Sequence, residues 1–209
     1  VKNITKIISG YTDTCLNLSN NFYKIICNLT VKASNIETAE FTKIYENIFR
    51  YVNIGLANEK KRISKKLNLD FNEILKLASS KPFGYMNFYP GIGVGGHCIP
   101  VDPYYLVWLA NKKKIKTEYV KLSGKINRST PRIVCKEIDK VIGLRKFKKI
   151  FILGLSYKKN ISDIRNSPNL EIFNYFFKKK YKINYNEENL KNIKIGKKNF
   201  RSLKINSNN

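Results

Sequence analysis

The sequence predicts a mostly helical domain followed by the start of an α/β domain. Two observations lead to this fold class. From residue 12 to about residue 145 the apolar residues recur at helical spacing, and at Lys148 the pattern changes to the β-leaning run KKIFILGLSY. Helix-like SPNLEIFNYFFKKK and strand-like YKINY follow that run, which is the order of a strand–helix–strand unit.

The helical part divides into several elements. Residues 12–28 predict a helix, and LTVKAS after it predicts a short extended piece. Ser34 and Glu37 have the spacing of a capping box, which predicts that a long helix begins there and continues to about Lys66. Its apolar stripe recurs at i, i+3, i+7, i+11 and i+15, and consists of Phe41, Ile44, Ile48, Val52 and Leu56. Residues 69–79 predict a further short helix.

A glycine-rich loop, YPGIGVGGHCIPVDP, interrupts the helices at residues 89–103. Its glycines allow backbone N–H groups to line the oxygens of a ligand. Asp102 followed by Pro103 is typical of a helix N-cap with proline in the first turn, so PYYLVWLANKKK predicts a helix. Cys98 then lies just before a helix N-terminus, whose partial positive charge favours the thiolate that a nucleophile requires. The alternative role for this cysteine is that of a small buried hydrophobe.

Residues 116–144 predict another helix, in which Pro131 permits a break. On the long helix, Lys43 and Asn47 lie one turn apart with Arg50 on the same edge, an arrangement that can hold an oxyanion or a sugar hydroxyl. Surface residues of amphipathic helices show the same spacing, so this pattern leaves both roles open. The single histidine, His97, is expected to be structural. The tail from Asn186 has little periodicity, so the α/β unit is expected to be incomplete.

The composition is that of an ordinary soluble chain. Its 209 residues are 43% hydrophobic, which is enough for a buried core. No run reaches the roughly 20 apolar residues that a membrane span needs, and the first residues lack the apolar region of a signal peptide. We therefore expect a cytoplasmic protein without a membrane segment. We also expect reduced thiols and no metal site, because no zinc or disulfide spacing relates Cys15, Cys27, Cys98 and Cys135.

The net charge of +25 arises from 40 Lys and Arg residues against 15 Asp and Glu residues. Such a balance ordinarily favours nucleic acid as a partner. Here the basic residues are spread along the chain, and neither a groove-reading motif nor an aromatic platform accompanies them. We therefore expect no nucleic-acid binding and only a mild attraction to anionic nucleotides.

Three stretches resemble the UDP-glucose/GDP-mannose dehydrogenase family. AEFTKIYENIFRYVNIGLANE resembles its central dimerisation helix, KPFGYMNFYPGIGVGGHCIPVDPYYLVWLA its active-site loop, and GLSYKKNISDIRNSP the start of its C-terminal nucleotide-sugar domain. The resemblance implies that residues 1–30 end an NAD-domain region with a connecting helix. It also implies that residues 31–145 form the central dimerisation domain and residues 146–209 a truncated UDP-binding α/β domain.

The resemblance also implies an activity, the oxidation of the sugar C6 alcohol to a carboxylate with two NAD+ in succession. Cys98 would be the nucleophile that forms a thiohemiacetal and then a thioester. Lys43 and Asn47 would stabilise the oxyanion and orient water, and Asp102 would assist the acid and base steps. The sequences KPFG and HCIPVDPYYL resemble those of UDP-N-acetylglucosamine 6-dehydrogenases more than those of UDP-glucose enzymes. The resemblance therefore implies UDP-N-acetylglucosamine as the substrate, with UDP-N-acetylmannosamine as the alternative. The residues expected to contact substrate are Arg50, Gly95, Tyr157, Lys158 and Arg165.

Several departures from the family pattern bear on activity. No stretch matches the G-x-G-x-x-G of the NAD domain, so we expect NAD to be bound mainly by a domain outside this chain, and the cofactor-binding residues stay unassigned. A separately encoded NAD-binding half would supply it. Ile92 replaces a usual proline, and NRSTP departs from the family's N-x-x-M-P. We expect a homodimer through the helix at residues 38–66 and no turnover by the isolated chain. The alternative is an inactive remnant that dimerises or binds a UDP-sugar.

Overall fold

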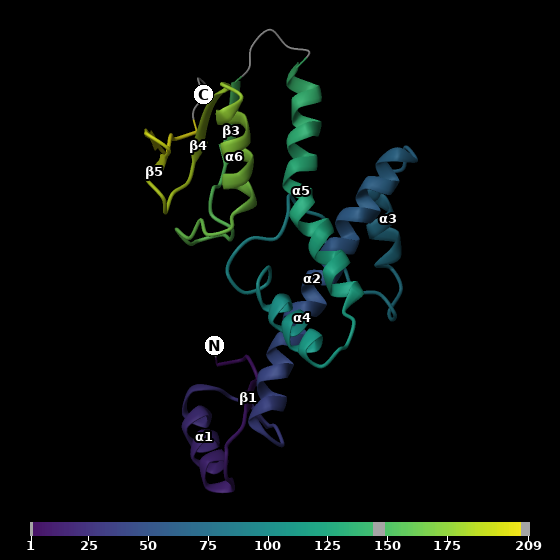
Figure 1. Ribbon diagram of the computed structural model, residues 1–209, viewed down its shortest axis with the longest axis vertical. Coiled ribbons are helices and arrows are strands. Elements are labelled where there is room, and N and C mark those ends of the chain that lie inside the picture. The colour runs from purple at the N-terminus through teal and green to yellow at the C-terminus, as the bar shows by residue number, and fades with distance from the viewer. Residues whose placement is uncertain (1, 144–148, 206–209) are drawn as a thin grey trace. The chain divides into compact units, whose positions relative to one another are not determined.

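The computed structural model describes residues 2–143 and 149–205. Its contacts group the chain into two units, Val1–Phe49 and Arg50–Asn209. Figure 1 shows the elements of both units along the chain. None of the described helices is long and apolar enough to cross a membrane. The predicted fold class is confirmed, since helices dominate up to Gly143 and a strand–helix–strand unit follows.

The first unit opens with a small strand–helix–strand unit of its own. Strands β1 (Lys6–Ile8) and β2 (Thr30–Lys32) are parallel, and α1 (Asp13–Ile26) connects them. The hydroxyl of Thr12 caps α1 by accepting a hydrogen bond from the backbone N–H of Cys15 at 3.2 Å. The predicted helix and extended piece are confirmed, whereas three residues of β1 are too few to show the two-residue period of a strand.

Helix α2 (Ile36–Lys66) begins in the first unit and ends in the second. The predicted capping box is wrong, because the side chain of Asn35 accepts the hydrogen bond from Thr38 N at 2.7 Å and the helix begins directly after it. Asparagine caps a helix as well as serine does, and Asn35 is one residue closer to the first turn.

Several of the residues of α2 that the chain buries are polar. Asn47 and Tyr51 are 1% exposed and Asn58 is 4% exposed, whereas the ends of the predicted apolar stripe, Phe41 and Leu56, are 44% and 41% exposed. The stripe is therefore present at the predicted spacing, but its ends do not enter the core of this chain.

The second unit continues with α3 (Phe71–Ala78), α4 (Asp102–Lys112) and α5 (Glu118–Gly143). Helix α5 runs through Pro131 without ending, so the permitted break does not occur. The side chain of Asn127 in α5 donates a hydrogen bond to Tyr51 O at 2.8 Å, and this buried contact ties α5 to α2.

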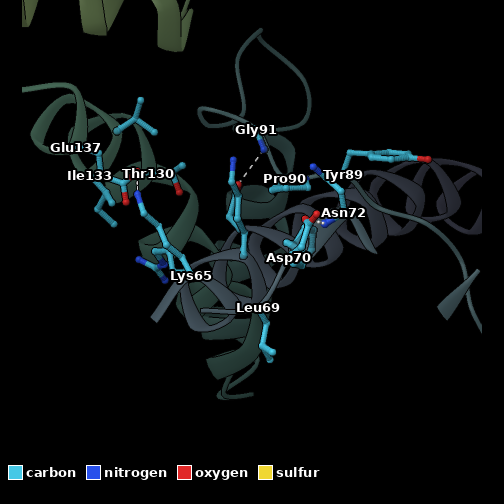
Figure 2. Close-up of a pocket in the computed structure, with 15 residues that line it drawn as sticks. Lys65, Leu69, Asp70, Asn72, Tyr89, Pro90, Gly91, Thr130, Ile133 and Glu137 are labelled. Carbon is cyan, nitrogen blue, oxygen red and sulfur yellow. Dashed lines mark hydrogen bonds and ion pairs between the residues drawn. The ribbon is translucent and has the colours of Figure 1, made fainter. Parts of the chain in front are cut away.

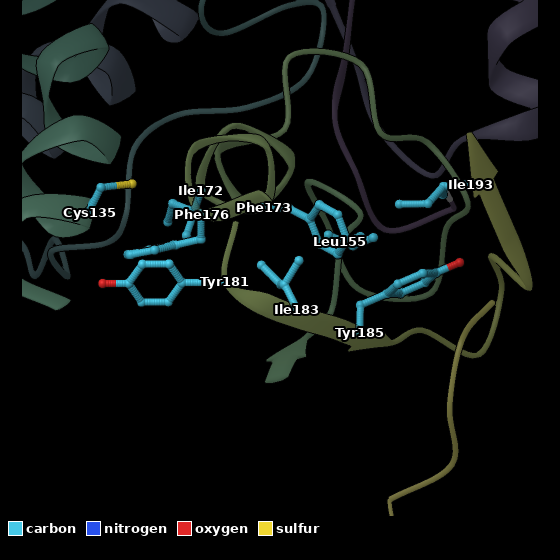
Figure 3. Packing of buried hydrophobic residues seen from close by; sticks show 9 residues of the cluster. All are labelled: Cys135, Leu155, Ile172, Phe173, Phe176, Tyr181, Ile183, Tyr185 and Ile193. Atoms are coloured by element: carbon cyan, nitrogen blue, oxygen red, sulfur yellow. The ribbon is translucent and has the colours of Figure 1, made fainter. Parts of the chain in front are cut away.

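The α/β part consists of β3 (Lys149–Leu153), α6 (Pro168–Lys178) and β4 (Lys182–Asn186). The two strands are parallel, as the predicted strand–helix–strand unit requires, and their register runs from Lys149 opposite Lys182 to Leu153 opposite Asn186. Figure 3 shows the core between them and α6, where Leu155, Phe173, Phe176 and Tyr185 are fully buried. Cys135 joins the same core from α5, so this helix packs against the α/β part.

The tail, whose sequence shows little periodicity, contains regular structure. Strands β5 (Asn192–Ile195) and β6 (Lys198–Arg201) form an antiparallel hairpin that turns at Gly196 with φ of 60°. The ring of Phe200 lies 5.0 Å from that of Phe173, between ring centres, and Ile193 is buried. These few inward-facing side chains hold the hairpin on the core.

Candidate functional site

The cysteine loop, residues 89–101, ends in a tight turn at Cys98. The backbone N–H groups of Val101 and Asp102 both donate to Cys98 O, at 3.0 and 2.8 Å. Helix α4 then begins at Asp102 itself, with Val101 as its N-cap and without a side-chain cap. The prediction that Asp102 is the N-cap is wrong by one residue. Its carboxylate instead lies in the first turn, where a negative charge also suits the helix dipole.

The glycines of the cysteine loop allow it to lie against residues 157–168, which we call the 157–168 segment. A Cβ atom added to Gly95 would lie 2.7 Å from Tyr157 Cβ and 2.8 Å from Pro168 Cδ. Gly96 adopts a φ of +91° and faces the Tyr157 ring, where a Cβ would lie 2.8 Å from Cε2. The side of Gly95 that a Cβ would occupy therefore faces this segment of the chain itself.

Two hydrogen bonds hold this contact. The N–H of Gly96 donates to Arg165 O at 3.2 Å, and the side chain of Asn166 donates to Gly96 O at 3.1 Å. Gly96 is thus bonded to the segment that carries Arg165. Cys98, which is exposed, follows Gly96 by two residues. Sequence reasoning places Tyr157, Arg165 and Cys98 in one site, and the structure brings them together.

Asp163 organises the charges of this site. Its carboxylate accepts from Arg165 Nε at 3.0 Å and from Arg165 Nη2 at 2.6 Å, and these bonds lower the pKa of Asp163 to about 2. The same bonds raise the pKa of Arg165, and the neighbouring Tyr157 and Cys98 side chains act in that direction too. Cys98 is thus within electrostatic reach of the guanidinium group. His97 Nδ1 lies 4.0 Å from the Asp163 carboxylate.

A crevice of about 420 Å³ opens at the carboxyl ends of β3 and β4. The carboxylate of Glu187 accepts hydrogen bonds there from Leu155 N and Ser156 N, both at 3.1 Å. Lys158 lines the same crevice. In open α/β sheets, ligands bind at the carboxyl ends of the strands, so this crevice is placed to receive a nucleotide.

Lys43 and Asn47 belong to the first unit, and Arg50 is the first residue of the second. Lys43 is 64% exposed at its side chain and lies 3.6 Å from the Glu46 carboxylate, whereas Asn47 is buried. The predicted shared edge of α2 follows from the helix that the structure shows.

Sequence reasoning missed two acids of this region. Asp163 stands two residues before Arg165, and that D-x-R spacing was the available signal. Glu187 directly follows β4 and lies two residues after the predicted strand YKINY, a position where an acid commonly faces a nucleotide in a strand–helix–strand unit.

The residues of the first strand–helix–strand unit do not fit an NAD cofactor. A dinucleotide needs an open glycine-rich turn in front of a helix N-terminus, where free N–H groups face its phosphates. Here a Cβ on Gly10 would collide with the backbone N of Leu16, and the Thr12 hydroxyl already accepts from Cys15 N. In the part of the chain that the structure describes, no group of three or more His, Cys, Asp or Glu side chains is arranged to hold a metal ion.

Two family models match the chain in succession. The central domain of the UDP-glucose/GDP-mannose dehydrogenase family matches residues 37–129, and the UDP binding domain of the same family matches residues 151–208. The first match contains the cysteine loop, and the second contains the 157–168 segment and the crevice.

Curated relatives carry the same two domains. A UDP-N-acetyl-D-mannosamine dehydrogenase from Campylobacter jejuni is 36% identical, over 96% of this chain and 48% of its own. A UDP-N-acetyl-D-glucosamine 6-dehydrogenase from Pseudomonas aeruginosa is 35% identical, over 82% of this chain and 42% of its own. The chain thus spans less than half the length of these relatives.

Solved structures agree. A UDP-N-acetyl-mannosamine dehydrogenase from Staphylococcus aureus superposes with a TM-score of 0.77 at 28% identity, over 90% of this chain and 44% of that one. A UDP-D-ManNAc dehydrogenase from Pyrococcus horikoshii gives the same TM-score at 30% identity, over 90% and 45%. With both domain models matched in order and the fold shared, the chain belongs to the UDP-glucose/GDP-mannose dehydrogenase family.

Proposed function

We propose that this chain forms the substrate-binding and thiol-bearing part of an NAD-dependent dehydrogenase that oxidises the C6 hydroxyl of a UDP-N-acetylhexosamine to a carboxylate. The observation that carries the proposal is the contact between the cysteine loop and the 157–168 segment. The hydrogen bonds of Gly96 with Arg165 and Asn166, two residues before Cys98, support a site that the Cys98 thiol and the Arg165 guanidinium share. A reactive sulfur and a phosphate-binding cation would then serve the two ends of one nucleotide sugar.

In this proposal Cys98 holds the sugar between the two oxidations. Its sulfur adds to the C6 aldehyde carbon to form a thiohemiacetal, and later carries the acyl group as a thioester until water releases the carboxylate. Lys43 and Asn47 stabilise the oxyanion and orient the water, and Asp102 exchanges the protons. NAD+, held by residues outside those described here, would accept the hydrides.

The UDP moiety would lie along the α/β part. Tyr157 and Arg165 flank the cysteine loop, and Lys158 lines the crevice at the ends of β3 and β4. Gly95 and Arg50 would complete the substrate contacts. One of the relatives above is named for UDP-N-acetylmannosamine and the other for UDP-N-acetylglucosamine. We propose UDP-N-acetylglucosamine as the substrate, with UDP-N-acetylmannosamine as the alternative.

We further propose that α2 mediates a homodimer at residues 38–66, within a central domain of residues 31–145. The exposed apolar residues along α2 support this, since Phe41, Leu56 and Ile63 are 44%, 41% and 53% exposed. A second candidate function is a dimerising or UDP-sugar-binding module without turnover. The misfit between NAD and the first strand–helix–strand unit favours it.

The test uses the 6-aldehyde of UDP-N-acetylglucosamine labelled with ¹³C at C6. We expect the 209-residue chain to convert the aldehyde signal into that of a thiohemiacetal carbon without any NAD+. Cys98→Ser should abolish the adduct, and the matched variant Cys15→Ser, which removes another exposed thiol, should retain it. An adduct that persists in Cys98→Ser would remove this cysteine from the mechanism.

A further inference from the structure

A second pocket is lined in part by the residues that begin the cysteine loop, Tyr89, Pro90 and Gly91. It measures about 550 Å³, which is in the range of small-molecule sites. Figure 2 shows Lys65 and Glu137 on one side of it and Asp70, Asn72 and Tyr89 on another. None of the residues assigned above to catalysis or substrate binding lines it.

One face of α2 supplies the positive charge of this pocket. Lys61, Arg62 and Lys65 line it at positions three, four and seven residues after Asn58, so all four share a helix face. Lys65 forms an ion pair with Glu137 at 2.9 Å. Within the described ranges, Lys61 and Arg62 form no ion pair, so these two cations are not paired with either of the carboxylates, Asp70 and Glu137, that also line the pocket.

Asn58 adds a buried donor that lacks an acceptor. The residue is 4% exposed, and its Oδ1 accepts the N–H of Gly91 at 2.9 Å. That bond fixes the orientation of the amide, because a flipped amide would set two donors against each other. Its Nδ2 is then buried with no hydrogen-bond partner among the residues the structure describes. A buried donor of this kind is rare in a native protein and calls for an acceptor.

The remaining walls combine apolar and aromatic residues with the polar side chains of Asp70, Asn72 and Thr130. Ile133 and Val134 of α5 lie on one wall, Phe71 on another, and the ring of Tyr89, which is 70% exposed, stands at the loop. The acid Asp70 accepts from Asn72 N at 2.8 Å, which commits it to capping α3. The pocket thus combines cations and an amide donor with a surface for a ring.

We infer that this pocket binds a small organic phosphate, with its phosphate oxygens at Lys61, Arg62 and the Asn58 amide and its ring against Tyr89, Ile133 and Val134. Cations and an amide donor suit phosphate oxygens, and the apolar walls select a ring-bearing molecule over free phosphate. Since Asn58 holds Gly91, the occupied pocket acts on the start of the loop that ends at Cys98. This inference is independent of the proposed oxidation.

The experiment titrates the ¹⁵N-labelled 209-residue chain with phenyl phosphate and records amide NMR spectra at constant ionic strength. We expect saturable shifts of the Gly91 backbone N–H and of the Asn58 side-chain amide. Neutral phenol should bind more weakly, because it brings no charge to the cations. In calorimetry the double variant K61Q/R62Q should bind phenyl phosphate about tenfold more weakly or worse, since it removes two charge-assisted hydrogen bonds.

The matched control is K121Q/K125Q, which removes the same charge from exposed positions of α5 outside the pocket and should leave the affinity within about twofold. Equal losses in both double variants would reduce the effect to general charge attraction and overturn the inference. So would shifts confined to Tyr157 and Lys158, which would place the probe in the nucleotide-sugar crevice. Inorganic phosphate binding as tightly as phenyl phosphate would refute the role of the apolar walls. If K61Q/R62Q loses its dispersed spectrum, the single exposed change Lys61→Glu carries the same test.

Discussion

The contact between Gly95 and the 157–168 segment gives a prediction that can be worked through from distances. A methyl group at Gly95 would lie 2.7 Å from Tyr157 Cβ, 2.8 Å from Pro168 Cδ and 3.0 Å from Asn166 O. Overpacking of this kind destabilises by about 1–3 kcal/mol, while the lost freedom of the unfolded chain returns about 0.4–1 kcal/mol. Gly95→Ala should therefore weaken the local contact by roughly 1–2 kcal/mol.

The Gly96 N–H, which donates to Arg165 O at 3.2 Å, reports directly on that contact. Weakening by about 1–2 kcal/mol should speed its hydrogen exchange roughly 5–30-fold. The control is Gly91→Ala in the same loop, whose added methyl would meet nothing nearer than Gly93 O at 4.0 Å, and which should leave the rate at Gly96 unchanged. Equal exchange rates in both variants would refute the packing argument.

Three further predictions concern other parts of the chain. Arg165 lowers the pKa of Asp163 from 3.8 to about 2, so the stabilisation is present above pH 4 and is lost as the pH falls towards 2. The protection factor of the Gly96 N–H, which is the observed exchange rate corrected for the pH dependence of an unprotected amide, should fall over that range, and Asp163→Asn should remove this fall. Phe173 is fully buried, so Phe173→Ala should lower the free energy of unfolding, measured in urea, by about 3–5 kcal/mol. A loss below about 1 kcal/mol would contradict the packing shown in Figure 3. Burial raises the pKa of Cys135 to about 11, so iodoacetamide at pH 8 should label the exposed Cys98 and Cys15 and leave Cys135 unmodified in the folded chain, as peptide mass spectrometry would show.

Long periodic elements could be predicted from the sequence because their signal repeats many times. The helix expected up to about Lys66 is found as Ile36–Lys66, and the strand–helix–strand order after Lys148 is found as β3, α6 and β4. Short elements gave too little signal. The hairpin of β5 and β6 packs Ile193, Ile195 and Phe200 against the core. Each strand is only four residues long and also carries lysine and asparagine, so its alternation was not apparent from the sequence.

The site divides in the same way. A glycine-rich loop in front of a helix, with Cys98 near its end, could be predicted from residue types alone. The contact of Gly96 with Arg165 and Asn166 could not, because those residues lie about 70 positions apart along the chain and no local spacing relates them. The pairing of Arg165 with Asp163 likewise depends on side-chain geometry that the motif only permits.

The carboxylate of Glu187 has a consequence for how the crevice would receive a nucleotide. By accepting the N–H groups of Leu155 and Ser156, it holds the turn after β3 in shape while no ligand is bound. An arriving phosphate would meet a rigid turn that is already tied to the protein's own anion, so no disorder has to be frozen out on binding. The phosphate would instead compete with the Glu187 carboxylate for the N–H groups of Leu155 and Ser156. Nucleotide exchange at this crevice would then resemble the replacement of one anion by another more than the closing of a flexible loop.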